Sequence, residues 1–151
     1  MPYDATPTLK ALKSFLQQQP RITTAQIGEP QSPPSGKINA GVYMDAIRTP
    51  EAVLDATTKV VDVVVRLYLS FTRLGEETEL TMLQAVTELM GDIEGDFDLD
   101  GTIRSVDVAG IYGQGLAAEW GESEVGGVQY RIVDVSIPLI VDSAAASLAA
   151  A

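Results

Sequence analysis

The chain contains neither cysteine nor histidine. These two absences exclude disulfides, most zinc sites and the nucleophile systems that pair cysteine or serine with histidine. They also remove the side chain that most often acts as a general base near neutral pH. We therefore expect a protein that is not an enzyme and that holds no cofactor.

Basic residues are scarce as well. The 10 lysines and arginines stand against 21 aspartates and glutamates, which gives a formal net charge of −11. A surface of this charge repels phosphate groups, so the sequence predicts no grip on nucleic acid. Apolar runs are too short for a membrane span of ~18 residues, and the N-terminus has no apolar block typical of a signal peptide. We expect a soluble protein, made in a cytoplasm, with no membrane partner.

The length of 151 residues suits one domain, because a chain of this size buries roughly 68–70% of its unfolded surface. We predict a single domain over residues 1–142. The alanine-rich residues 143–151 are predicted to form a flexible tail.

The longest apolar run with strand composition is Val60–Phe71. At a two-residue period its odd-numbered side chains form a wholly apolar face, whereas the even-numbered ones include Asp62, Arg66 and Tyr68. We predict a central strand with one face in the core. Two interpretations of the second face stay open: Arg66 and Tyr68 contact another subunit, or Arg66 pairs with a carboxylate on a neighbouring strand of a solvated sheet.

Two amphipathic helices are expected beside this strand. The first begins at Thr6-Pro7, with Thr6 as the capping residue, and ends at Pro20. The second runs from about Glu77 to Ile93, with acidic residues at its N-terminus. Its predicted apolar face consists of Leu80, Leu83, Val86, Leu89, Met90 and Ile93.

Alternation and composition predict further strands at Ile22–Ile27, Ile38–Ile47, Ile103–Ala109 and Val128–Val141. Pro138 has no N–H, so the last strand is expected at an edge of the sheet or irregular near its end. The glycine-rich residues 110–127 are predicted to form a long hairpin loop with a wide or mobile tip. The fold class is therefore α+β, with a mostly antiparallel sheet of about four to five strands and two helices packed on one face.

The sharpest chemical motif is the stretch from Asp96 to Asp107. Its carboxylates at loop positions 1, 3, 5 and 12 and its glycine at position 6 match the EF-hand pattern for Ca²⁺. Aspartate at position 12 and strand-like alternation after it weaken the match, and a helix-to-strand turn explains the same residues. A metal site is kept as the minor alternative, with the ligands Asp96, Asp98, Asp100 and Asp107.

Five stretches together resemble the tail terminator proteins of long-tailed bacteriophages over about Leu9 to Asp142. They are Ala25–Pro30 with Ser32–Gly36, Val65–Tyr68, Gly95–Leu99, Val106–Gly110 and Tyr130–Asp142. The resemblance implies a small α/β protein that forms a hexameric ring on the tail tube, ends its polymerisation and joins the tail to the head. The implied partners are further copies of the chain, the major tail tube protein and a head-completion or neck protein, and the implied location is the virion.

Several consequences follow from the resemblance. Interface residues are expected in the loops and on the second face of the central strand; they are Glu29, Pro30, Arg66, Tyr68, Tyr112 and Trp120. Acidic side chains in the lumen of a ring would let genomic DNA pass without specific binding. Other neck and tail-completion proteins of phages have a similar size and also form rings, so such a protein is one alternative. A small calcium-binding module is the second alternative.

Overall fold

β3 lies at the centre of a mixed, six-stranded sheet in which the strand order is β1-β2-β3-β6-β4, and β5 pairs with β6 as well. The structure is a computed structural model, and it describes residues 3–30, 37–50, 58–70, 75–95 and 97–142. The elements are α1 (Thr6–Gln17), β1 (Ile22–Ile27), β2 (Ile38–Arg48), β3 (Thr58–Ser70), α2 (Gly75–Glu94), β4 (Ser105–Val106), β5 (Ala117–Val125) and β6 (Val128–Asp142). The predicted tail at 143–151 and the end of the predicted central strand, Phe71, lie outside the described residues.

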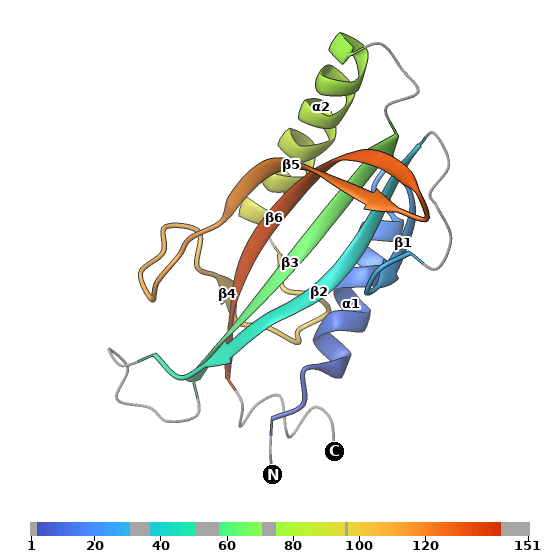
Figure 1. Cartoon of the computed structure of the whole chain (residues 1–151). Coiled ribbons are helices and arrows are strands. Elements are labelled where there is room, and N and C mark those ends of the chain that lie inside the picture. Colours follow the sequence, from blue (N-terminus) through green and yellow to red (C-terminus); the bar gives the residue numbers. More distant parts are fainter. Residues whose placement is uncertain (1–2, 31–36, 51–57, 71–74, 96, 143–151) are drawn as a thin grey trace.

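The strands pair antiparallel except for β1, which runs parallel to β2. Figure 1 shows both helices behind the sheet, so that they cover one face only. We call this the closed face and the opposite one the open face. The α+β class and the two helices on one face are thus as predicted, and the sheet has more strands than the four to five expected.

The core forms on the closed face because the alternation of the strands points every second side chain at the helices. The odd-numbered residues Val61 to Leu69 of β3 and Val133 to Val141 of β6 belong to one buried cluster with both helices. In α1, Leu12 and Leu16 are fully buried, and Phe15 meets Phe97 edge to face with ring centroids 4.8 Å apart. The predicted apolar face of the central strand is confirmed.

Two local predictions about the helices change. The N–H of Thr6 donates to the carboxylate of Asp4 over 2.9 Å, so Thr6 lies inside α1 and does not cap it. Hydrogen bonds from Thr6, first from its side chain and then from this N–H, lower the pKa of Asp4. In α2 the buried face is Thr78, Met82, Ala85, Val86, Leu89 and Ile93. Leu80 and Leu83 are exposed, because the predicted stripe was rotated relative to the face that the sheet covers.

Residues 103–127 differ most from the prediction. Only Ser105–Val106 of the predicted strand 103–109 pairs with β6, and half of the predicted glycine-rich loop is the strand β5. The hairpin between β5 and β6 closes tightly at Gly126-Gly127, whose φ values of 58° and 80° suit a two-residue turn.

β6 is an interior strand, although Pro138 predicted either an edge position or an irregular end. It pairs with β3 along one side and with β5 and then β4 along the other. The carbonyl of Pro138 accepts the N–H of Asp107 over 2.9 Å on that second side. In an antiparallel strand the N–H and C=O of one residue point to the same side. Pro138 therefore lacks its N–H on the side where the partner of β6 changes from β5 to β4, and no ladder hydrogen bond is lost to β3.

Candidate interaction surface

The open face is the candidate functional surface because no helix of the described chain covers it (Figure 1). It is formed by the even-numbered residues of β3 and β6 and by their neighbours on β2 and β5. Charged side chains lie in its middle, an aromatic cluster at one end, and the loop between β4 and β5 at the other.

An ion pair occupies the middle of this face. Arg66 of β3 and Asp134 of β6 lie directly opposite each other. The guanidinium donates two parallel hydrogen bonds to the carboxylate, Nε to Oδ1 over 2.7 Å and Nη2 to Oδ2 over 2.9 Å. These bonds raise the pKa of Arg66. The guanidinium also lies 5.8 Å from the ring centroid of Tyr43, a cation–π distance.

Next to this pair lies the aromatic cluster. Tyr68 is buried with Tyr130, Val125 and Ile132 in a second, small core, where the end of the β5–β6 hairpin curls in front of β3 (Figure 1). The rings of Tyr68 and Tyr130 meet edge to face at 6.1 Å. The hydroxyl of Tyr68 lies 2.7 Å from that of Tyr43. Burial, and then this hydrogen bond, raise the pKa of Tyr68 well above 10.0.

A β-bulge places a second ion pair on the open face. The pairing of β2 with β3 shifts by one residue between Met44 and Ala46. The shift turns Arg48 to the side of Asp62, and its Nε donates to the Asp62 carboxylate over 2.7 Å. This bond raises the pKa of Arg48. Asp45, the extra residue of the bulge, lines a cavity of about 230 Å³ with Gln114 and Ser136.

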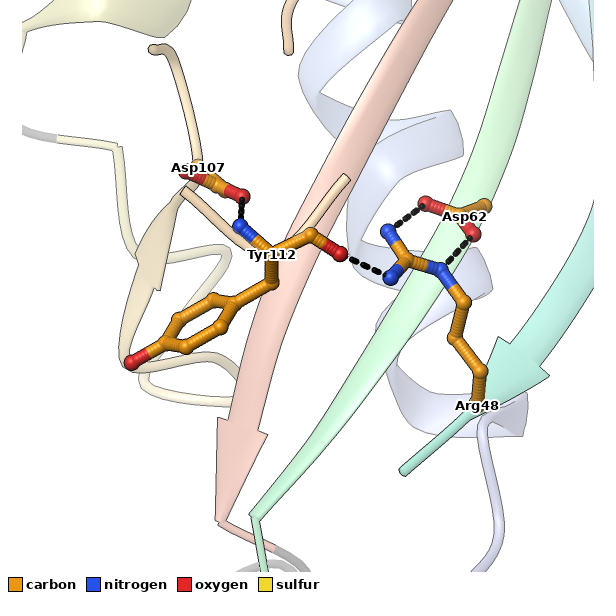
Figure 2. A network of polar contacts seen from close by, with 4 residues as sticks. All are labelled: Arg48, Asp62, Asp107 and Tyr112. Carbon is orange, nitrogen blue, oxygen red and sulfur yellow. Dashed lines mark hydrogen bonds and ion pairs between the residues drawn. The ribbon is translucent and has the colours of Figure 1, made fainter. Parts of the chain in front are cut away.

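Arg48 also holds the loop between β4 and β5. Figure 2 shows its guanidinium between Asp62 and the carbonyl oxygen of Tyr112, to which it donates. On the other side of the loop, the buried carboxylate of Asp107 accepts the N–H groups of Ile111 and Tyr112, each over 2.8 Å. The loop backbone is therefore tied both to the sheet and to the end of β4.

Glycines allow this loop, residues 107–116, to fold tightly on itself. Gly110 has a φ of 77°, and a Cβ there would lie 2.6 Å from the carbonyl oxygen of Gly113. A Cβ on Gly115 would collide with the carbonyl oxygen of Val108, which accepts the N–H of Leu116. The loop is thus shorter than the long hairpin loop that was predicted, and its backbone packs closely against itself. Only glycine fits at positions 110 and 115 of this backbone.

The predicted interface residues do not all meet. Arg66 and Tyr68 come together on the open face through Tyr43, and Tyr112 reaches the same face through its carbonyl oxygen. Trp120 lies on β5 opposite Val133 and so faces the helix side; it was predicted in a loop. Glu29 and Pro30 follow β1, and no contact that places them on the open face is present in the described residues.

The minor metal alternative has little support from the described ligands. Asp107 uses both carboxylate oxygens for backbone N–H groups, and the residues after it, where an EF-hand needs a helix, form a loop that leads to β5. Leu99 and Asp100 have positive φ values of 49° and 58°, as expected for the turn interpretation. No group of three acidic side chains suited to a metal occurs among the described residues, which do not include Asp96.

Sequence reasoning missed Arg48, Asp134 and Tyr43 as members of this surface. A carboxylate opposite Arg66 was one of the two interpretations, and Asp134 is that partner. Its position in the alternation of β6 was a usable signal, because Asp134 interrupts the apolar residues Ile132 to Val135. Arg48 had no such signal, since the bulge decides which face it joins.

Neither a scan against protein-family models nor a search of curated proteins finds a match to this chain. Neither helix in the described part of the chain combines the length and the apolar character needed to cross a membrane.

Proposed function

We propose that this chain is a structural subunit of a phage virion, a tail terminator that forms a hexameric ring, caps the tail tube, ends its polymerisation and joins it to the head or neck. The open face carries the proposal. It is a sheet surface without a helix layer, yet its arginines Arg48 and Arg66 are already paired with carboxylates and its loop is held in place. Such a surface suits contact with further subunits, because little ordering remains to be done on binding.

The chemistry of the face supports binding over catalysis. The pKa values of Arg66 and Tyr68 both move away from neutrality. Neither group therefore exchanges a proton near pH 7, as a general acid or base must. The order of the five resembling stretches supports the particular assignment to tail terminators.

The net charge of −11 fits a ring around DNA. If acidic side chains line the lumen, phosphates are repelled and the genome slides through without specific contact. A lumen lined by lysine and arginine would contradict this part of the proposal.

Electron microscopy of the purified protein tests the ring directly. We expect closed rings, and tail tubes assembled in the presence of the protein should end at a ring and stop growing. A protein that stays monomeric at high concentration and leaves tube growth unchanged would refute the proposal. The alternative is another ring protein of the phage neck. Such a protein would form rings that bind the head particle and leave tail tubes uncapped.

A further inference from the structure

The loop of residues 107–116 displays two large apolar side chains to solvent, Val108 and Ile111. Ile111, at its tip, is 77% exposed, more than any other large apolar side chain of the described residues. Its own N–H is fixed by Asp107 and the next carbonyl by Arg48. A fixed backbone that exposes an isoleucine favours docking, because the entropy of ordering the loop has been lost before binding.

Charge indicates which partner meets this loop. Each copy carries a net charge of −11, so two copies repel each other over most of their surface. Residues 108–118 contain no charged side chain at all. A basic partner would be recognised better through the acidic surface, whereas like-charged copies need a charge-free contact. The loop therefore suits a second copy of this chain.

The same chain offers an apolar strip on the closed face of β1 and β2. Ile27 of β1 and Met44 and Ile47 of β2 are exposed. The register places all three toward the closed face, since Ile27 neighbours Val42 while Met44 and Ile47 stand opposite Val63 and Val61. Figure 1 shows the loop beyond β6, away from β1. At the end of β2, Arg48 reaches the loop on the open face, whereas its neighbour Ile47 points to the closed face, so the loop and the strip are separate patches. A contact between two different patches of identical subunits is head to tail, which is the type that closes rings.

We propose that Ile111 of one copy packs against the strip of Ile27, Met44 and Ile47 on the next copy. This inference rests on the proposed ring, for which it names the contact between subunits. The loop is the fixed element of the contact, and the strip is its receiving surface.

Disulfide trapping tests the pairing, because the chain has no cysteine of its own. In the double variant Ile111→Cys/Ile47→Cys, mild oxidation should link neighbouring copies into a covalent series up to a closed ring on a denaturing gel. The matched control is Ile111→Cys/Leu83→Cys, since Leu83 on α2 is exposed to 47% and Ile47 to 51%. The control should give no more than background dimers. Equal cross-linking in both variants would overturn the proposal.

A charge at the tip provides a second measurement. Ile111→Asp should weaken assembly by about tenfold or more, because an apolar contact is replaced by a carboxylate facing an acidic neighbour. The control Leu83→Asp should assemble as the unchanged protein does, and urea midpoints of both variants show whether they fold. If the unchanged protein forms rings and caps tubes while Ile111→Asp assembles normally, the proposed contact of Ile111 is refuted and the proposed tail-terminator function is kept. If the unchanged protein forms no rings, both proposals fail.

Discussion

The closed and open faces use the same strands in opposite ways. On the closed face, the odd-numbered side chains from Val61 to Leu69 of β3 and from Val133 to Val141 of β6 are at most 1% exposed and wholly apolar. On the open face, the side chains of Arg66 and Asp134 keep 33% and 29% of their surface exposed and satisfy each other by hydrogen bonds. Burial of apolar area stabilises the first face at ~1.5–3 kcal/mol for each large side chain. Pairing of partly exposed charges contributes far less. We infer that folding depends mainly on the closed face.

The largest effect is expected on the closed face. Leu67→Ala leaves a cavity in the main core cluster and should lower the free energy of unfolding by ~2–5 kcal/mol. Urea denaturation followed by circular dichroism measures the loss. The matched control is Val64→Ala in the same strand, because the Val64 side chain lies on the open face and outside the core. This substitution should lower the free energy of unfolding much less. Similar losses at the two positions would show that the faces do not differ in the way described.

A smaller loss is expected from the loop on the open face. Gly115→Ala brings a Cβ against the Val108 carbonyl, and the loop must open. We expect a loss of ~1–3 kcal/mol together with faster amide exchange at Ile111 and Tyr112. Gly91→Ala, where a Cβ meets nothing within 4 Å, is the control and should not speed exchange in the loop. Unchanged exchange in Gly115→Ala would contradict the tight path of residues 107–116.

Alkaline pH should act on the open face through Tyr68. Its pKa is raised in the folded protein by burial, so the unfolded chain loses the proton first. Stability is therefore full below pH 10 and falls as the pH rises above the ordinary value of 10.0, by up to ~1.4 kcal/mol per pH unit for one group. Urea titrations at pH 8 to 11 measure the slope. Tyr68→Phe should have a shallower slope, and an identical one would show that Tyr68 does not contribute.

The smallest effect concerns the central ion pair. Arg66→Met should cost ~1 kcal/mol in the monomer, because the pair is partly exposed and screened by solvent. Adding Asp134→Asn should recover part of the loss, since no lone carboxylate then remains. If rings cover the open face, the single variant should weaken assembly more than folding, because an unpaired charge costs more when it is buried. Equal effects on folding and assembly would place this pair outside any interface.

Much of the fold could be predicted where the sequence pattern is strong and local. β3 and β6 alternate over many residues, and α2 has both an acidic first turn and an apolar period, so their existence followed from the chain alone. β5 could not be recognised, because Ala117–Val125 contains Gly121, three glutamates and little apolar alternation. It is a strand because β6 pairs with it. Conversely, residues 107–109 read as strand but end the pairing, because Asp107 turns its carboxylate to the loop that follows.

The candidate surface was predictable only in part. Arg66 and Tyr68 were placed correctly on a half-polar face by the two-residue period. Tyr112 was predicted as a loop residue, but its role comes from a backbone carbonyl, which no side-chain pattern reveals. Trp120 faces the helix side because β5 is a strand in register with β6, and that register is a property of the pairing.

The sequence by itself determined the charge of −11, the lack of histidine and cysteine, and the alternation that makes one side of β3 apolar. Composition and local period suffice for these. Only the tertiary structure decided which charges meet: Arg66 and Asp134 are 68 residues apart in the chain, and a single bulge in β2 brings Arg48 to Asp62 and the loop. Strand pairing and its register select these partners, and both depend on contacts between segments that are distant in sequence.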